Sequence, residues 1–334
     1  MTRASELMRE AVVCDMTLPW LHHYMVDEDV TLPRYKRAGI DFVSLTVNIT
    51  RNSLAETVRH ISDVKAHIRS RSAQMVFAAS AEDIRAAKAS GRLAVGLHFQ
   101  GTEPLDGAIE LVQTYYDLGI RHMLLAYNQK NAVGDGCAER TDCGLSRFGM
   151  RLIEEMNRVG MLVDGSHTGY RTTMEAMEVC QAPFIFSHSN AYALVPHYRN
   201  IHDDQIRACA RSGGLIGING VNEFLGNADA STASMFEHID YMSTLVGPQH
   251  VGIGLDYVKD LSAIWKWTLE NPELWPANNG LPAPKPAHAQ PEQISELAAL
   301  MLSRGYSEQD VRGILGGNFL RVMQDAQAAR RHRP

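Results

Sequence analysis

The stretch "GLSRFGMRLIEEMNRVGMLVDGSH", Gly144 to His167, decides the fold because it holds a helix, a strand and a polar strand end in one short unit. Its first part has apolar residues at helical spacing, and Met161 to Asp164 is a short apolar run of strand length. A histidine follows this strand within three residues. A helix that leads into an apolar strand is typical of a parallel sheet with both faces covered by helices.

Seven more apolar runs of strand length recur along the chain. They are Val12 to Asp15, Phe42 to Val47, Leu93 to Phe99, His122 to Ala126, Pro183 to Ser187, Gly214 to Asn219 and Val251 to Asp256. Segments with helical spacing, such as "DDQIRACARSGG", separate them. Eight strands in this alternation predict an α/β fold closed into a (β/α)8 TIM barrel, with an open doubly wound sheet as the alternative. Gln74 to Ala79 is predicted to be an accessory strand.

The composition narrows the class of protein. The chain has 334 residues, 45% of them hydrophobic and 21% charged, and a net charge of −6 without a run of Lys or Arg, which argues against nucleic acid as a partner. The N-terminus lacks the apolar core of a signal peptide, and no apolar window is long enough for a membrane span. Five scattered cysteines favour a reducing compartment, so we predict a cytoplasmic protein. Cys137 and Cys143 are interpreted as two free thiols, with pairing or a shared metal as alternatives.

We predict one domain over residues 1–334. A Pro- and Trp-rich break, Trp265 to Gln293, follows the eighth strand, and we predict that residues 258–293 form a lid loop over the barrel mouth. The alternative is a surface excursion stiffened by proline. Residues 294–326 are predicted to form a C-terminal helical pair.

Polar residues follow the strands at the end where barrel enzymes carry their active sites. His167 in "VDGSHTG" and His188 in "FIFSHSN" end neighbouring strands in the same way, which is typical of two ligands of one metal ion; either alone would be read as a satisfied polar residue. Asp256 in "VGIGLDY" ends an apolar strand and needs a metal or an arginine as partner. Arg199 suits a substrate carboxylate, and an ion pair with Asp203 or Asp204 on the surface is the alternative.

The motifs "GLSRFGMRLIEEMNRVGMLVDGSH", "FIFSHSNAYALVPHYRNIHDDQIRACARSGGLIGI", "HVGIGLDY" and "LSRGYSEQDVRGILGGNFLRVM" resemble the membrane (renal) dipeptidase family of zinc hydrolases, peptidase family M19 of the amidohydrolase superfamily. The resemblance runs from about residue 11 to residue 325 and implies an amidohydrolase-like barrel with two zinc ions. It implies that His167 and His188 bind the second zinc, that Asp256 is the metal-binding aspartate of the last strand, and that Arg199 binds the substrate carboxylate.

Four residues depart from the family pattern. Asp15 and Thr17 stand where the family has a His-x-Asp pair, Gln100 stands at the glutamate that bridges the two metals, and Tyr127 stands at the histidine that contacts the oxyanion. A neutral glutamine does not offset the charge of two cations as a carboxylate does. We therefore predict one zinc ion, with His167, His188, Asp15, Asp256 and Gln100 as candidate ligands and two ions as the alternative. His22, His23 and His98 are further candidate ligands, although nothing in their spacing requires this role.

These residues predict an enzyme, a dipeptidase-like hydrolase that cleaves an amide bond in a small substrate with a free carboxylate. Asp256 is the predicted general base and Tyr127 the donor to the oxyanion, while Arg199, Tyr127 and Asn128 are predicted to bind substrate. The alternatives are a lyase or decarboxylase of the same superfamily and a ligand-binding pseudo-enzyme. We expect no nucleic-acid or membrane partner, and the family implies a possible homodimer.

Overall fold

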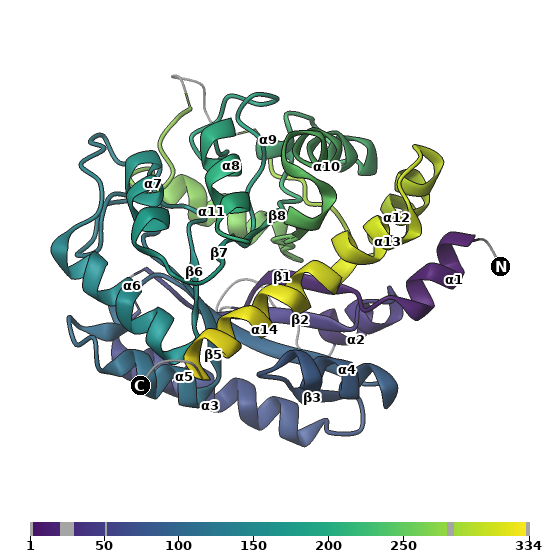
Figure 1. Cartoon of the computed structure of the whole chain (residues 1–334), viewed down its shortest axis with the longest axis horizontal. Coiled ribbons are helices and arrows are strands. Elements are labelled where there is room, and N and C mark those ends of the chain that lie inside the picture. Colours follow the sequence, from purple (N-terminus) through teal and green to yellow (C-terminus); the bar gives the residue numbers. More distant parts are fainter. Residues whose placement is uncertain (1–2, 21–29, 51, 279–283, 332–334) are drawn as a thin grey trace.

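The computed structural model of the chain describes residues 3–20, 30–50, 52–278 and 284–331, and its centre is a parallel barrel (Figure 1). Neighbouring strands pair in parallel in the order β1-β2-β4-β5-β6-β7-β8-β9, and β3 pairs with β4 alone. The strands are β1 (Cys14–Pro19), β2 (Phe42–Ile49), β3 (Met75–Phe77), β4 (Leu93–Gln100), β5 (Ile120–Leu124), β6 (Leu162–Asp164), β7 (Phe184–Phe186), β8 (Leu215–Ile218) and β9 (Val251–Ile253). The predicted barrel and its accessory strand are confirmed.

The barrel is nearly closed where its last strand returns to its first. Just beyond β9, the backbone N–H of Asp256 donates to the carbonyl oxygen of Thr17 at 3.1 Å. The N–H of Leu255 donates to the side-chain Oδ1 of Asp15 at 2.9 Å. These bonds hold the carboxyl-terminal ends of β1 and β9 together, at the end of the barrel where the predicted site residues lie.

Helices alternate with the strands and surround them (Figure 1). Local signals set their ends: in α6, the Ser146 side chain accepts from the N–H of Gly149, and Gly160 ends the helix in a left-handed conformation. The helices before the last strand are α1 (Arg3–Glu10), α2 (Thr31–Arg37), α3 (Leu54–Ser70), α4 (Ala81–Ala89), α5 (Leu111–Leu118), α6 (Arg147–Val159), α7 (Tyr170–Val179), α8 (Asp203–Arg211), α9 (Asn222–Leu225) and α10 (Thr232–Val246), with 3₁₀ turns η1 (Glu103–Leu105) and η2 (Pro248–His250).

The C-terminal helices close the base of the barrel. The predicted pair is α12 (Gln293–Ser303) followed by a continuous helical run of α13 (Glu308–Arg312), the π-helical turn η3 (Gly313–Gly317) and α14 (Asn318–Arg331), which crosses the barrel in Figure 1. Phe319, Leu320, Val322 and Met323 of α14 share one core cluster with residues from the starts of the strands, including Cys14, Phe42, Ala94 and Leu215. A Cβ atom at Gly316 would lie 2.4 Å from the carbonyl oxygen of Val12, so this close approach requires glycine. The predicted site residues lie at the opposite end of the barrel, where the strands end.

The segment predicted as a lid loop contains a helix, which corrects that part of the prediction. Residues 261–270 form α11 (Leu261–Glu270), whose first turn is capped because Asp260 Oδ1 accepts from the N–H groups of Ser262 and Ala263 at 3.0 and 2.9 Å. The sequence did not predict this helix because proline and tryptophan dominate the composition of the segment. Residues 279–283 of the same segment lie outside the described residues.

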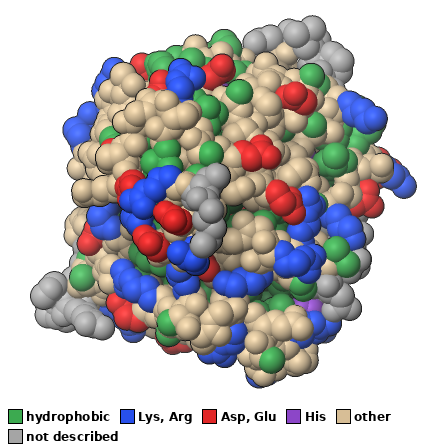
Figure 2. Space-filling view, turned by 90° about the vertical axis from the view of Figure 1, so that its right-hand side faces the viewer, with side chains coloured by type: hydrophobic (Ala, Val, Ile, Leu, Met, Phe, Trp, Pro, Cys, Tyr) green, Lys and Arg blue, Asp and Glu red, His purple; other side chains and the backbone are tan. Residues whose placement is uncertain are grey.

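The surface carries charges of both signs. On the face shown in Figure 2, Lys and Arg side chains are interspersed with Asp and Glu side chains. Among the described residues, no helix has the length and apolar composition that crossing a bilayer requires.

Candidate active site

Three residues at the carboxyl-terminal ends of strands have left-handed backbone conformations. The φ angles are 57° at Asn128, 63° at His167 and 55° at Asp256. Each such residue costs about 1–3 kcal/mol when it is not glycine, and such strain concentrates at functional sites. All three are predicted site residues, and the strain marks this end of the barrel as the functional one.

The predicted histidine pair is brought together. Nε2 of His167 and Nε2 of His188 lie 3.0 Å apart. Nδ1 of His167 lies 2.7 Å from Oδ1 of Asn128, whose amide nitrogen donates to the carbonyl oxygen of Leu274 at 2.8 Å. Because the Asn128 oxygen only accepts, His167 carries its proton on Nδ1 and presents a lone pair on Nε2.

His188 is held from its other side by hydroxyl groups. Its Nδ1 lies 2.7 Å from Oγ of Ser187 and 3.2 Å from Oγ1 of Thr17. Burial, helped by the positive charge of Arg199, lowers the pKa of His188 to about 3, and burial lowers the pKa of His167 well below its usual value. Both rings are therefore neutral near pH 7, which is the form that binds metals.

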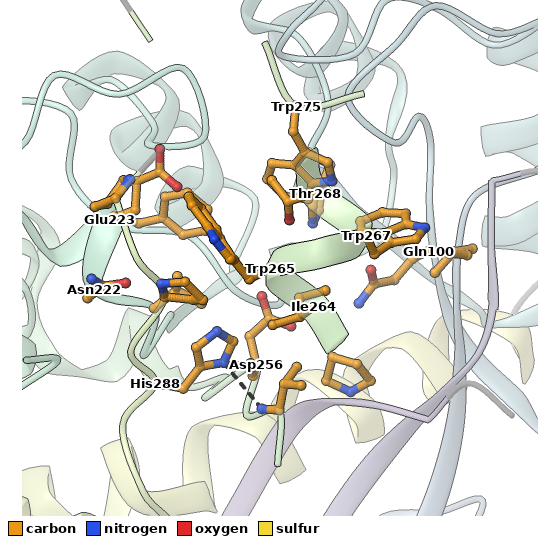
Figure 3. Close-up of a pocket in the computed structure, with 18 of the residues that line it drawn as sticks. Gln100, Asn222, Glu223, Asp256, Ile264, Trp265, Trp267, Thr268, Trp275 and His288 are labelled. Atoms are coloured by element: carbon orange, nitrogen blue, oxygen red, sulfur yellow. Dashed lines mark hydrogen bonds between the residues drawn. The ribbon is translucent and has the colours of Figure 1, made fainter. Parts of the chain in front are cut away.

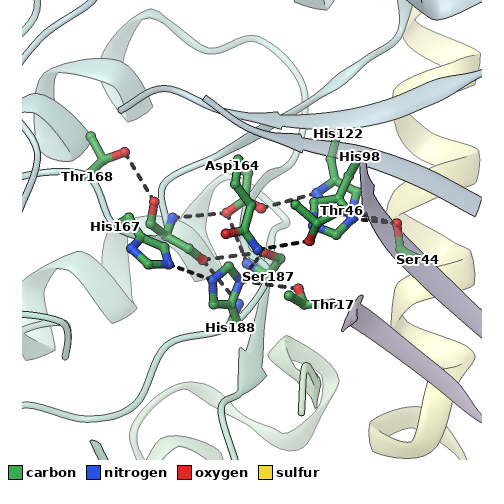
Figure 4. A network of polar contacts seen from close by, with 12 residues as sticks. Thr17, Ser44, Thr46, His98, His122, Asp164, His167, Thr168, Ser187 and His188 are labelled. Carbon is green, nitrogen blue, oxygen red and sulfur yellow. Dashed lines mark hydrogen bonds and ion pairs between the residues drawn. The ribbon is translucent and has the colours of Figure 1, made fainter. Parts of the chain in front are cut away.

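A chain of buried polar groups extends from the histidine pair to Thr46 (Figure 4) and continues to Gln100. Gln100 Nε2 donates to Thr46 Oγ1 at 3.1 Å, and that hydroxyl contacts His98 Nε2 at 2.9 Å. Ser44 Oγ then lies 2.9 Å from His98 Nδ1 and 3.2 Å from His122 Nε2. The chain thus spans the inside of the barrel, and it engages both ring nitrogens of His98, which was considered as an added ligand.

The chain continues from His122 to the second histidine of the pair. His122 Nδ1 lies 3.1 Å from Oδ2 of Asp164, and Oδ1 of Asp164 accepts from the N–H of Ser187 at 3.1 Å. Burial by itself raises the pKa of Asp164, but the His122 contact outweighs it and lowers the pKa to about 2. Sequence reasoning assigned no role to Ser44, Thr46 or Asp164. Ser44 and Thr46 stand two apart in an apolar strand, a spacing that puts both on one face and could have revealed them.

The predicted catalytic residues, Asp256 and Tyr127, share one cavity with His167. Figure 3 labels Asp256 in this cavity. This main cavity encloses about 830 Å³ including its mouth, and its walls include Gln100, Tyr127, His167 and Asp256. Burial raises the pKa of Asp256, opposed by the charge of Arg199 and by a hydrogen bond that Asn219 Nδ2 donates at 3.1 Å. Tyr127 stacks on His167 with ring centroids 4.1 Å apart, and burial raises the pKa of its phenol, which stays a hydrogen-bond donor.

Arg199 is buried without an acidic partner. It is 2% exposed, its Nη2 donates to the carbonyl oxygen of His188 at 3.2 Å, and its Nε is buried without a hydrogen-bond partner. Within the part of the chain that the structure describes, Arg199 forms no ion pair. The alternative partners are engaged elsewhere, since Asp203 accepts from the Tyr241 hydroxyl at 2.8 Å and Asp204 accepts from the Tyr170 hydroxyl.

Arg199 lines a second cavity of about 620 Å³, which shares His167 with the main cavity. His167 therefore stands between the cavity of the guanidinium and the cavity of Asp256 and Tyr127. Cys137 also lines the second cavity, and both it and Cys143 are free thiols, as predicted.

Asp15 and Asn128 are placed away from the walls of both cavities. Asp15 Oδ1 accepts from the N–H groups of Thr17 and Leu255, and its Oδ2 accepts from the Tyr35 hydroxyl at 3.2 Å. The side-chain amide of Asn128 contacts His167 and the backbone carbonyl oxygen of Leu274. These contacts brace the barrel seam and position His167. The roles of metal ligand for Asp15 and substrate contact for Asn128 stay predictions.

The residues that the structure brings together do not fit the metal centre implied by the family resemblance. Among the described residues, no group of three or more His, Cys, Asp or Glu side chains is arranged to hold a metal ion. The histidine pair supplies two nitrogens, whereas a catalytic zinc ordinarily has three protein ligands. His22 and His23, considered as added ligands, lie outside the described residues.

Comparisons with known proteins agree with the fold. The family model described as membrane dipeptidase (peptidase family M19) matches residues 1–274 and 280–334. Dipeptidase aclJ of Aspergillus oryzae is 31% identical over 316 residues, 89% of this chain and 70% of that protein, and an uncharacterized dipeptidase, C965.12, of Schizosaccharomyces pombe is 30% identical over 73% of this chain and 56% of its own. The crystal structure of an amidohydrolase from Pseudomonas aeruginosa superposes with a TM-score of 0.87 at 28% identity, over 98% of this chain and 100% of that one.

Proposed function

The chain belongs to the membrane dipeptidase family and is a hydrolase of the amidohydrolase fold, and we propose that it cleaves an amide bond in a small substrate that bears a free carboxylate. Membership of this family supports hydrolysis of a peptide-type bond. The features of the chain's own site support the remaining details.

The single observation that carries the proposal is the guanidinium of Arg199, which is buried without an ion-pair partner among the described residues. A buried charge without a partner is costly, and a carboxylate is the group that satisfies a guanidinium with two parallel hydrogen bonds. Arg199 lines the second cavity and donates to the backbone of His188, and its buried Nε has no hydrogen-bond partner among the described residues. A substrate carboxylate bound there would place the neighbouring amide bond beside His167, at the junction of the two cavities.

Asp256 and Tyr127 would then carry the chemistry in the main cavity. Asp256, whose pKa is raised by burial, would accept a proton from the attacking water as the new C–O bond forms. The Tyr127 phenol would donate to the oxyanion of the tetrahedral intermediate. When the C–N bond breaks, protonated Asp256 would return its proton to the leaving amine, which balances the reaction as amide plus water giving acid plus amine.

We assign no step to a metal ion, because the described residues do not complete a metal site. A family of metallopeptidases implies a metal cofactor, generally zinc. A single ion at His167 and His188 remains our prediction, supported by the two ring nitrogens that face each other. The cytoplasmic location, the homodimer and the absence of nucleic-acid and membrane partners also remain predictions.

The incomplete ligand set is a specific observation in favour of a second candidate, a lyase or decarboxylase that works without a metal ion. The two candidates differ in their response to chelation. Activity that survives dialysis against a chelator, on a carboxylate substrate that loses carbon dioxide or another group without adding water, would replace hydrolysis by this second function.

A comparison of acids with amides tests the proposed function. Wild type is assayed on a panel of dipeptides and N-acyl amino acids and on the same compounds with the carboxylate converted to an amide. We expect kcat/KM to be at least tenfold lower for the compounds whose carboxylate has been converted to an amide. Arg199→Lys should raise KM for the compounds with a free carboxylate by a similar factor, because an ammonium group does not reproduce the two parallel hydrogen bonds. Arg207→Lys, on the surface of α8, is the matched control. Equal rates on acids and amides would contradict the proposal.

A further inference from the structure

The three tryptophans of the lid segment lie on one side of the main cavity (Figure 3). Trp265 and Trp267 belong to α11, and Trp275 follows it. We infer that they form a subsite for an aromatic group on the acyl side of the bond that is cleaved. This inference rests on the proposed function, which places the carboxylate of the leaving amine at Arg199 in the other cavity.

The aromatic wall continues from the lid to the reacting groups through Trp275. Its ring is 6.3 Å from Trp267 in an edge-on arrangement and 6.5 Å from Phe224 in a stacked one. The same ring lies edge-on at 6.0 Å to Tyr127 and 5.9 Å to His167. A flat group that packs against this wall would therefore lie next to the carbonyl that Asp256 and Tyr127 act upon, with the edge and face contacts that aromatic rings prefer.

The charges around the cavity exclude an anionic group. No Lys or Arg is among the described residues of its walls, and its acidic residues are Glu223 and Asp256. Glu223 is paired with His197 Nε2 at 3.1 Å, and Asp256 accepts from Asn219. An acidic side chain would meet two carboxylates and no counter-ion, whereas an apolar ring would exchange water for tryptophan, phenylalanine and proline surfaces.

The lid is fixed in place over this subsite. Asn128 Nδ2 donates to the carbonyl oxygen of Leu274 at 2.8 Å, and Gln129 Nε2 donates to that of Glu273 at 3.0 Å. These two amides follow β5 and hold the backbone on the N-terminal side of Trp275. The subsite is thus formed before a ligand arrives, which reduces the entropy that binding must overcome.

Two features indicate that the tryptophans contact a ligand and do not serve only to pack the hydrophobic core. No residue of α11 is fully buried, so Trp265 and Trp267 keep part of their surface for a ligand, in contrast to Trp20, which is 3% exposed in the core. The indole N–H of Trp275 is buried and finds no hydrogen-bond partner among the residues that the structure describes. Leaving such a donor unpaired is unfavourable, and an oxygen of a bound acyl group would accept its hydrogen bond.

Equilibrium binding tests the subsite independently of turnover. Isothermal titration of Asp256→Asn, which lacks the proposed base, gives Kd for Phe-Gly, Ala-Gly, Glu-Gly and Lys-Gly, while wild type is assayed for hydrolysis of the same four dipeptides. We expect Phe-Gly to bind at least tenfold more tightly than Ala-Gly. Glu-Gly should bind most weakly, because its side chain would still meet the Glu223 carboxylate and no Lys or Arg among the described residues of the walls.

Variants of the lid helix assign the preference to the tryptophans. Adding Trp267→Ala to Asp256→Asn should reduce the ratio of the Phe-Gly and Ala-Gly affinities to within about threefold, because the ring loses one wall of its site. Leu269→Ala, on the exposed side of α11, is the matched control and should keep the full ratio.

The outcomes separate the two proposals. A preference for Phe-Gly without hydrolysis by wild type would overturn the proposed function and support the subsite. Hydrolysis with equal affinity for Phe-Gly and Ala-Gly, or with Glu-Gly or Lys-Gly bound most tightly, would overturn the subsite and leave the proposed function standing. Binding of none of the four dipeptides would overturn the subsite as well.

Discussion

The imidazole rings of His167 and His188 face each other through their Nε2 atoms at 3.0 Å, although the two residues come from the ends of different strands. Two nitrogen ligands of one tetrahedral zinc ion are about 3.3 Å apart, given Zn–N bonds of about 2.0–2.1 Å. With its proton on Nδ1, His188 would donate to Ser187 and leave both Nε2 lone pairs directed toward a common point. With its proton on Nε2, His188 would instead bond His167 directly.

This pair leads to a prediction about metal content. Protein purified without chelators should contain no more than about one equivalent of zinc or another first-row metal per chain, because the described residues offer two imidazoles and no further group to complete a second site. The double variant His167→Ala His188→Ala should lose that metal. Elemental analysis of both proteins measures it, and His250→Ala, near the base of the barrel, is the control.

Either of two results would contradict this assignment. Two equivalents of metal per chain would show that Asp15 or Gln100 binds a metal ion despite the contacts seen here. Metal retained in full by the double variant would move the binding site away from the histidine pair.

Gln100→Glu should raise the metal content toward two equivalents. Gln100 lines the same cavity as His167 and Asp256, so the substitution adds a negative charge that offsets the charge of a second cation. The Thr46 hydroxyl, which now accepts from the Gln100 amide, is able to donate to the new carboxylate. Elemental analysis after zinc loading compares it with Gln309→Glu on the exposed surface of α13, and an unchanged metal count would rule out this account of residue 100.

Asp15→Asn should make stability less dependent on pH. Burial raises the pKa of Asp15 to about 7, although three hydrogen bonds oppose the shift, while the unfolded chain releases this proton near pH 3.9. Folded wild type therefore holds a proton that the unfolded chain has lost, and its stability falls as pH rises from about 4 through 7, by up to about 4 kcal/mol. Asparagine keeps the oxygen that accepts from Thr17 and Leu255 and removes the titration.

Denaturant unfolding of chelator-treated protein at pH 5 and pH 8 measures this effect. The variant should be more stable than wild type at pH 8 by about 1–4 kcal/mol, and the difference should be smaller at pH 5. An equal loss of stability at both pH values would show that the carboxylate is ionised in the folded protein and is needed in that form.

The strands, the histidine pair and the family were predictable from the sequence because each depends on local information. The apolar residues of a run such as Pro183 to Ser187 are enough to predict a strand. The repeated Ser-His ending places two imidazole rings at the same end of parallel strands, and this does not depend on how the side chains pack. The lid helix α11 was not predictable, since tryptophans and prolines dominate its surroundings and its capping residue, Asp260, is one polar residue among several.

The partners of the polar atoms were decided by tertiary structure alone. Asp15 looks like a candidate ligand in sequence, yet the closure of β9 against β1 brings the Leu255 N–H to one oxygen of its carboxylate, and the packing of α2 brings the Tyr35 hydroxyl to the other. Arg199 looks equally suited to Asp203, and only the packing of the chain leaves its Nε unpartnered next to the histidines. The sequence by itself determined which residues end the strands, because side-chain periodicity is local. The tertiary structure decided which of these side chains keep polar atoms available for a substrate or a metal ion. The reason is that hydrogen bonds depend on how strands far apart in the chain are paired.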